Sequence, residues 1–227
     1  LPAGKINFVV KKNSLFLKCG SYQANFIGLS ASEFPSVPTL KGKKTIVFED
    51  EYLIETVNQV AFAAAQDEGR PVLTGILLIE KGKKLVWAAT DGYRLSLKEM
   101  NNFRKISKKD DFSKGLIIPA RTLMEVAKIV EEQEKTKEVG LAVMPASNQA
   151  IFSTSNSEIV SRLIEGQFPE FEKIIPEKGT TKITIETAEI LKAVRVASVF
   201  ARESANIIKL EIKKGKLKVS ANTPQIG

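Results

Sequence analysis

Apolar and polar residues alternate in three short stretches of the chain, each interrupted at its centre by a turn that pairs lysine with glycine or asparagine. These stretches are residues 6–17, 76–86 and 210–219. Alternation places the apolar side chains on one face of a strand, and a short polar turn between two such runs is typical of a β-hairpin. The pattern therefore predicts three hairpins.

A helical spacing precedes two of these hairpins. Residues 50–66 carry apolar side chains one, four, seven and eight positions after Leu53. Residues 187–202 repeat this spacing from Ile190, with Ser198 at the last position, and both patterns predict an amphipathic helix packed on a sheet. Asp50 and Thr187 are the predicted N-caps. A further helix is predicted over 119–133, which begins with a proline and carries an apolar stripe.

The order of these elements repeats. A Phe-Pro pair follows a strand-rich stretch at Phe34 and again at Phe168, and the helix and hairpin patterns recur at nearly the same interval. We therefore predict a repeated unit of roughly 130 residues. The chain holds first the C-terminal part of one unit, then a whole unit, then the N-terminal part of another. Residues 39–44 and 177–181 are rich in Lys, Gly and Thr and are the predicted linkers.

The composition is that of a globular protein, with 43% hydrophobic and 26% charged residues among 227. Apolar runs are too short to cross a bilayer, and the first residues do not form a signal-peptide pattern. A single cysteine, Cys19, fits a reducing cytoplasm, so a cytoplasmic location is expected. The net charge of +8 favours a polyanionic partner, with nucleic acid first; a lysine-rich solvated surface accounts for it equally well.

The sequence lacks the residues that most catalytic mechanisms require. The chain has no histidine and one cysteine, which excludes histidine-based triads and thiolate zinc sites, and it has no phosphate-binding glycine loop. Its paired acids are sequence neighbours rather than a metal cage. We expect no catalytic residue, no cofactor and no metal.

The segment 90–95 is the one place where chemistry could reside, because an acid, Asp91, stands beside Gly92, Tyr93 and Arg94. Asp-Gly is a strong turn dipeptide. Without a histidine, a metal cluster or a phosphate loop nearby, catalysis is the least favoured interpretation. A plain turn and one wall of a binding site are the alternatives.

Residues 89–95 read Ala-Thr-Asp-Gly-Tyr-Arg-Leu, residues 70–75 read Arg-Pro-Val-Leu-Thr-Gly, and residues 168–176 read Phe-Pro-Glu-Phe-Glu-Lys-Ile-Ile-Pro. These three segments resemble the ATDGHRL, RPxLTG and FPDYxxxxP segments of the bacterial DNA sliding clamp family, the beta subunit of DNA polymerase III. Residues 29–38 resemble the Glu-Phe-Pro end of its first domain. The resemblance covers essentially the whole chain, although such clamps tend to be acidic overall.

The resemblance implies an α+β DNA-clamp fold, with repeated domains in which two helices pack on curved antiparallel sheets. Residues 1–44 would form the C-terminal part of clamp domain one, 45–178 the whole of domain two, and 179–227 the N-terminal part of domain three. The chain is expected to be a fragment of a parent that closes as a homodimer around double-stranded DNA, with no membrane partner.

The resemblance also implies a hydrophobic peptide-binding groove between domains two and three. Its residues would be Leu73, Thr90, Gly92, Tyr93, Arg94, Leu95, Pro169, Lys173 and Ile174. In the family this groove accepts short linear motifs of the DNA polymerase III core, the clamp loader and repair polymerases. Tyr93 stands where His is common, and Lys173 where Arg is common. The family's groove also uses the end of domain three, so the groove is expected to be incomplete here.

A clamp that slides must contact phosphates rather than base edges. The candidate DNA-facing residues lie on polar faces of the second and third predicted helices and are Arg121, Lys128, Lys192, Arg195 and Arg202. The first helix has no basic residue and would contribute through Asn58, Gln59 or Gln66. The expected function is that of a non-enzymatic processivity factor for a replicative DNA polymerase. A nucleic-acid binder that does not encircle DNA and an enzyme acting on nucleotides are the alternatives.

Overall fold

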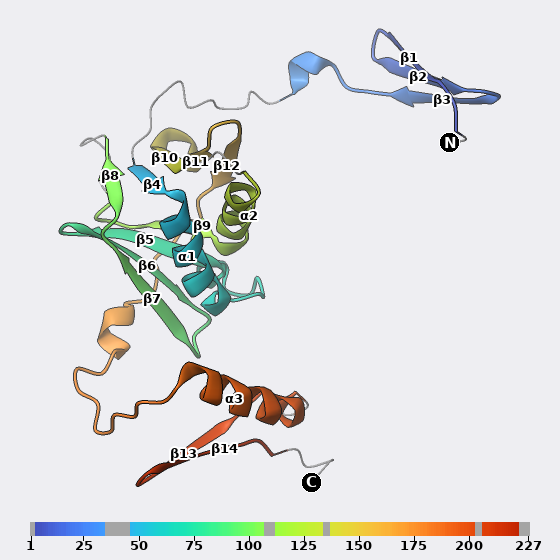
Figure 1. Cartoon of the computed structure of the whole chain (residues 1–227). Coiled ribbons are helices and arrows are strands. Elements are labelled where there is room, and N and C mark those ends of the chain that lie inside the picture. The colour runs from blue at the N-terminus through green and yellow to red at the C-terminus, as the bar shows by residue number, and fades with distance from the viewer. Residues whose placement is uncertain (1–2, 35–45, 107–111, 134–136, 203–205, 223–227) are drawn as a thin grey trace. The chain divides into compact units, whose positions relative to one another are not determined.

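The computed structural model describes residues 3–34, 46–106, 112–133, 137–202 and 206–222 (Figure 1). The chain divides into two compact units, Leu1–Glu170 and Phe171–Gly227. We call the second the C-terminal unit. Within the first, we call residues 3–34 the N-terminal sheet and residues 46–170 the central domain.

The N-terminal sheet has three antiparallel strands in the order β1-β2-β3. Their bounds are Ile6–Lys11, Ser14–Cys19 and Tyr22–Ile27. The predicted first hairpin is thereby confirmed, and Lys12 in its turn adopts a left-handed φ of 51°. A 3-10 helix, Ala31–Glu33, follows. The Phe-Pro ending predicted after it lies partly, and the linker 39–44 wholly, outside the described residues.

Two antiparallel sheets form the central domain. The five-stranded sheet has the order β12-β11-β10-β4-β8, and the four-stranded sheet the order β7-β6-β5-β9. The strands of the first are β4 (Ile46–Glu49), β8 (Phe103–Lys105), β10 (Glu138–Met144), β11 (Gln149–Ser153) and β12 (Glu158–Arg162). Those of the second are β5 (Gly75–Lys81), β6 (Lys84–Thr90), β7 (Leu95–Met100) and β9 (Leu116–Pro119). The predicted second hairpin is β5 and β6.

The central domain holds two helices, and each begins where a strand ends. Helix α1 (Asp50–Val60) follows β4, and α2 (Ala120–Glu131) follows β9. The prediction of one helix over 50–66 was too long. The chain tightens into a 3-10 helix at Ala61–Ala63 and then becomes extended, because the Ala65 N–H bonds to the Leu73 carbonyl oxygen at 2.9 Å instead of continuing the helix.

The predicted N-caps were wrong by one residue. Glu49 and Glu186 hold the cap positions, and neither makes a side-chain cap hydrogen bond. Asp50 is the first helical residue because β4 runs directly into α1, where the Asp50 N–H bonds to the Lys137 carbonyl oxygen at 3.2 Å. Its carboxylate still lies in the first turn, where the helix dipole favours negative charge.

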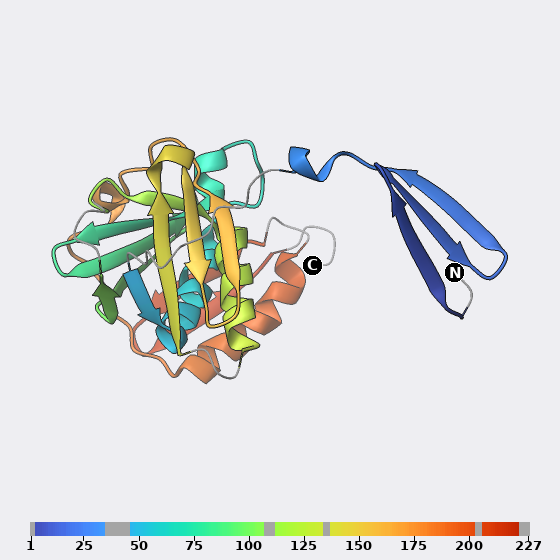
Figure 2. The ribbon, with the colours of Figure 1, turned by 90° about the horizontal axis from the view of Figure 1, so that it is seen from above.

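Both sheets and both helices of the central domain share one hydrophobic core. Leu53 of α1 and Leu123 of α2 are fully buried in it. Phe48 of β4 and Trp87 of β6 join the two sheets directly, with ring centroids 5.7 Å apart in an edge-to-face arrangement. The strands β10, β11 and β12 are seen side by side in Figure 2. Two helices packed on antiparallel sheets are the architecture that was predicted for the repeated unit.

The C-terminal unit contains a 3-10 helix (Phe171–Ile174), helix α3 (Thr187–Ala201) and the antiparallel strands β13 (Lys209–Lys213) and β14 (Lys216–Ser220). The predicted third helix and third hairpin are thereby confirmed. The predicted linker 177–181 is exposed and has neither helix nor strand. Among the described residues, no helix is long and apolar enough to cross a membrane.

We predict that Leu123→Ala lowers the free energy of unfolding of the central domain by about 2 to 5 kcal/mol, because a buried leucine leaves a cavity when truncated. Urea unfolding followed by the fluorescence of Trp87, the single tryptophan, measures this change. Met124→Ala is the matched control, since Met124 is the next residue of α2 and is exposed. Equal destabilisation by the two variants would contradict the assignment of the core face of α2.

Candidate functional site

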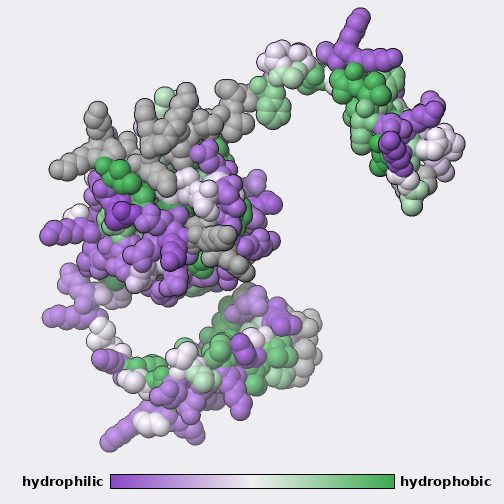
Figure 3. Space-filling model, turned by 45° about the horizontal axis from the view of Figure 1, so that its top comes forward, coloured by the Kyte–Doolittle hydropathy of each residue, from purple (hydrophilic) through white to green (hydrophobic). Residues whose placement is uncertain are grey.

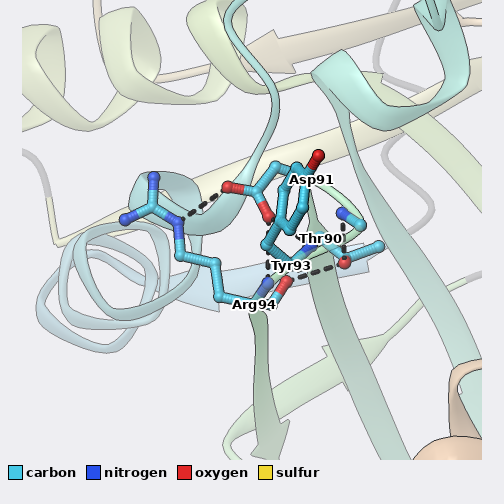
Figure 4. A network of polar contacts seen from close by, with 5 residues as sticks. Thr90, Asp91, Tyr93 and Arg94 are labelled. Atoms are coloured by element: carbon cyan, nitrogen blue, oxygen red, sulfur yellow. Dashed lines mark hydrogen bonds and ion pairs between the residues drawn. The ribbon is translucent and has the colours of Figure 1, made fainter. Parts of the chain in front are cut away.

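The segment between β6 and β7 is a turn held by its own side chains (Figure 4). The Thr90 hydroxyl donates to the Arg94 carbonyl oxygen at 2.7 Å and accepts from the Gly92 N–H at 3.0 Å. Asp91 Oδ1 accepts from the backbone N–H groups of Tyr93 at 2.9 Å and of Arg94 at 3.0 Å. Gly92 has a φ of 93°, which glycine adopts without a steric penalty.

Both carboxylate oxygens of Asp91 are engaged in this turn, because Oδ2 accepts from Arg94 Nε at 2.9 Å. The hydrogen bond from the Arg94 backbone N–H is the largest influence on the pKa of Asp91 and lowers it; partial burial opposes the shift and the Tyr93 N–H adds to it. A general base needs a pKa near the working pH. Asp91 therefore serves as a structural acceptor.

The side chains after Asp91 face outward or along the sheet. Tyr93 is 95% exposed, and the Arg94 guanidinium lies over the ring of Phe62, 5.6 Å from its centroid. Leu95 begins β7, is half-buried, and pairs with the buried Thr90 across the sheet. An exposed aromatic ring, a cation held over another ring and a half-buried leucine thus lie within one turn.

Leu73 lies in a 3-10 helix, Pro71–Thr74, which leads directly into β5. Its side chain is buried, and its N–H donates to the Arg70 carbonyl oxygen at 2.9 Å. The Thr74 hydroxyl donates to the Pro71 carbonyl oxygen at 2.7 Å. Internal hydrogen bonds therefore hold the segment 70–75 in its conformation, as they do the turn after β6.

Close contacts at two glycines join these segments. A Cβ on Gly92 would lie 3.4 Å from Arg70 Nη1, and a Cβ on Gly166 would lie 2.7 Å from Val72 Cγ2. The segment 70–75 thus lies between the turn after β6 and the chain that enters the Phe-Pro segment. The topology agrees, since β5 and β7 begin, and β6 and β9 end, at the same end of the four-stranded sheet.

The remaining predicted groove residues divide between the two units. Phe168 is buried and Pro169 is exposed at the end of the first unit. Lys173 and Ile174 lie on the 3-10 helix of the C-terminal unit, and Ile174 is 68% exposed. The structure brings Leu73, Thr90, Gly92, Tyr93, Arg94 and Leu95 together at one end of the central domain.

Sequence reasoning missed two residues at this end of the domain. Phe62 lies beneath the guanidinium of Arg94, and Arg70 lies beside Gly92. Arg70 opens the segment 70–75, so its position in that motif was the available signal. For Phe62, an exposed aromatic just after α1, the sequence pattern carries no signal.

The five candidate DNA-facing residues are all exposed on or beside helices. Arg121 and Lys128 lie on α2, where Glu125 is also exposed. Lys192 and Arg195 lie on α3, and Arg202 follows its last residue. Helix α3 carries one exposed acid, Glu189, and α2 carries two, Glu125 and Glu131, so acids dilute the basic surface less on α3.

The polar residues proposed for the first helix differ in their contacts. Gln59 Nε2 donates to Glu55 Oε1 at 2.8 Å, and the Gln59 carbonyl oxygen accepts from the Ser96 hydroxyl at 2.6 Å. Asn58 is exposed on α1. Gln66 lies beyond the helix, so its expected place on the helix was wrong.

Within the described part of the chain, no group of three or more His, Cys, Asp or Glu side chains could hold a metal ion.

Two family models match the chain. Residues 48–170 match the central domain of the DNA polymerase III beta subunit, and residues 172–227 match its C-terminal domain. Since the first match alone spans more than half of the sequence, the chain belongs to the DNA polymerase III beta subunit family.

The similar proteins are sliding clamps. The beta sliding clamp of Bacillus subtilis (strain 168) is 30% identical over an alignment of 230 residues, and the alignment covers 100% of this chain and 59% of that protein. A crystal structure of the DNA polymerase sliding clamp from Bacillus subtilis matches with a TM-score of 0.78 and 30% identity, covering 100% of this chain and 58% of that chain. The chain thus spans about six-tenths of the length of these relatives, and its α+β fold is that of the DNA clamps.

A further solved relative carries a ligand. A sliding clamp from Pseudomonas aeruginosa bound to griselimycin matches with a TM-score of 0.75 and 26% identity, covering 97% of this chain and 57% of that chain.

We predict that Asp91→Asn lowers the free energy of unfolding at neutral pH, because the neutral amide loses the ion pair with Arg94. The Asp91 pKa is depressed on folding, so the carboxylate stabilises the fold above its ordinary pKa of 3.8, and this contribution is lost as the pH falls through the lower folded value. The difference between variant and parent should therefore shrink towards acid. Glu68→Gln, in a neighbouring loop, is the control that removes one exposed charge. A difference independent of pH would contradict this account.

Proposed function

We propose that this chain is part of a DNA sliding clamp that acts as a processivity factor for a replicative DNA polymerase. The observation that carries the proposal is the convergence of segments 70–75 and 89–95 at one end of a domain of the beta subunit family. In this proposal residues 1–44 end clamp domain one, 45–178 form domain two and 179–227 begin domain three. The whole protein is a cytoplasmic homodimer that encircles double-stranded DNA.

The proposed clamp is not an enzyme. Asp91, the acid that raised the possibility of catalysis, accepts hydrogen bonds from its own turn and has a lowered pKa. Neither property suits proton transfer at neutral pH. Its role is to shape the turn that presents Tyr93 and Leu95.

The proposed docking groove is apolar with a few polar groups at its edge. In this proposal the half-buried Leu95 supplies apolar surface from the central domain and the buried Leu73 backs it. Pro169 and Ile174 are the further apolar residues of the proposed groove. Tyr93, Arg94 and Lys173 provide the polar groups that fix the direction of a bound peptide. The occupants are short linear motifs of the DNA polymerase III core, the clamp loader and repair polymerases, which end in apolar residues.

We predict that Leu95→Asp lowers the affinity for a fluorescent peptide of this kind by at least about tenfold, because it places an unpaired carboxylate in an apolar site. Fluorescence anisotropy of the labelled peptide, titrated with the chain, measures the affinity. Leu97→Asp is the matched control, since Leu97 is an exposed leucine two residues further along β7. Equal binding by the parent and both variants would remove the groove assignment.

The proposed DNA surface is formed by basic residues of the helices, and its contacts go to phosphates. Arg121 and Lys128 of α2 and Lys192, Arg195 and Arg202 at α3 are its members. Phosphate contacts carry no base sequence and so allow sliding. Because α2 has two exposed acids and α3 has one, we assign the larger share of the affinity to α3.

We predict that Arg195→Gln reduces the slope of log affinity against log salt concentration for duplex DNA by about one, as expected for the loss of one phosphate contact. Binding of a labelled duplex is measured over a series of salt concentrations. Lys216→Gln on β14 removes the same charge from a hairpin outside the proposed surface and should leave the slope nearly unchanged. The same reduction in both variants would mean that net charge, and not the helix surface, sets the affinity.

A further inference from the structure

The guanidinium of Arg94 is held by two groups of the central domain. Its Nε donates to Asp91 Oδ2 at 2.9 Å, and this ion pair lies within the turn between β6 and β7 (Figure 4). Its Cζ lies over the ring of Phe62, 5.6 Å from the ring centroid. A carboxylate fixes one edge of a guanidinium, and an aromatic face attracts its delocalised charge. Arg94 is therefore restrained both at an edge and at a face.

These two restraints leave the Nη edge of the Arg94 guanidinium for another molecule. Within the described residues, neither Nη1 nor Nη2 has a hydrogen-bond or ion-pair partner, and the side chain is 54% exposed. The donors of a guanidinium lie in one plane, so fixing that plane also fixes the direction in which the remaining N–H groups point. Arg94 thus presents an oriented pair of donors before any ligand binds.

Backbone hydrogen bonds set the position of Phe62. It is the middle residue of the 3-10 helix Ala61–Ala63, and both of its neighbours are buried. The Ala64 N–H closes this helix onto the Ala61 carbonyl oxygen at 3.1 Å. The two alanines point into the domain and the ring between them points outward. The fold of this segment therefore does not depend on the Phe62 ring.

Two further hydrogen bonds anchor this segment to the candidate site. The Gln59 carbonyl oxygen, in the last turn of α1, accepts from the Ser96 hydroxyl of β7 at 2.6 Å. The Ala65 N–H donates to the Leu73 carbonyl oxygen at 2.9 Å. The first bond lies before Phe62 in sequence and the second lies after it. Together they hold the ring against the turn between β6 and β7.

The Phe62 ring does not belong to the hydrophobic core. Its side chain is 58% exposed, and among the described residues it is not one of the apolar side chains that pack in the core of the central domain. The visible surface of that domain is mostly hydrophilic (Figure 3). The ring does contact the Arg94 cation. We therefore expect Phe62 to act through Arg94 rather than through burial.

We propose that Phe62 is a positioning residue of the docking groove. Together with Asp91 it holds the Arg94 guanidinium in one orientation, so that the Nη edge donates to a bound peptide. This inference rests on the proposed docking function. Ordering a long arginine side chain in advance removes part of the conformational entropy that binding would otherwise cost. The aromatic face carries the effect, because its quadrupole attracts the cation.

The test compares Phe62→Leu with Phe62→Tyr in the 227-residue chain. Leucine keeps an apolar side chain without an aromatic face, whereas tyrosine keeps the face. Fluorescence anisotropy with a labelled peptide that ends in apolar residues measures the affinity. We expect Phe62→Leu to weaken binding by about two- to fivefold, as for the loss of an exposed cation–π contact, and Phe62→Tyr to bind like the parent. Tyr52→Leu removes another exposed aromatic, on α1, and should leave the affinity unchanged.

A double-mutant cycle separates a positioning role from a purely structural one. If Phe62 acts through Arg94, then Phe62→Leu should not weaken peptide binding further in an Arg94→Gln background. A general loosening of the central domain would instead weaken binding by the same factor in both backgrounds. The non-additivity of the two substitutions is therefore the decisive quantity.

The orientation of the guanidinium can be measured without peptide. Relaxation of the ¹⁵N nucleus gives the order parameter of the Arg94 Nε–H bond, and Arg94→Gln assigns the signal by removing it. In Phe62→Leu the order parameter should fall into the flexible range, below about 0.6, and in Phe62→Tyr it should stay at the parent value.

Two results would overturn the proposal. They are equal order parameters in the parent and Phe62→Leu, and an equal loss of affinity on Phe62→Leu in the two backgrounds of the cycle. Leu95→Asp distinguishes failure of this inference from failure of the proposed function. If Leu95→Asp abolishes binding while Phe62→Leu binds like the parent, only the positioning role fails. If Leu95→Asp also binds like the parent, the docking groove fails and the positioning role fails with it.

Discussion

An apolar sheet face or helix stripe must be covered by another layer, and this constraint organises the whole chain. The central domain satisfies it internally. Two sheets and two helices enclose one core, and the edge-to-face contact of Phe48 with Trp87 ties the sheets to each other. Because that core fixes the end of the four-stranded sheet where β5 and β7 begin, it also fixes Leu73 and Leu95, on which the proposed docking groove depends.

Much of the fold could be predicted from the sequence because hairpins and amphipathic helices are local patterns. The turn at Gly82 and the stripe of α2 depend on neighbouring residues only. The end of α1 could not be predicted, because it is set by the hydrogen bond between Ala65 and Leu73. The start of α1 depends on Lys137, far along the chain, whose carbonyl oxygen accepts from the N–H of the first helical residue.

The parts of the candidate site were predictable from the residues, whereas their assembly was expected only from the family resemblance. The dipeptide Asp91-Gly92 by itself predicts a turn. That Arg70 lies beside Gly92, and Val72 beside Gly166, is a matter of tertiary packing that no spacing reveals. The net charge does not locate a binding surface, since many lysines lie on strands and turns as well as on helices. Lys84, for example, forms an ion pair with Glu99 of the neighbouring strand.

The position of β4 has a consequence for biosynthesis. This strand lies between β8 and β10 in its sheet. Glu49 of β4 pairs with Glu138 of β10, which lies about 90 residues further along the chain. At a translation rate of roughly 5–20 residues per second, the ribosome completes β4 several seconds before β10 exists. Until β8 and β10 have both been made, Ile46 and Phe48 lack a neighbouring strand on at least one side, so the nascent domain passes through an interval in which a chaperone could bind them.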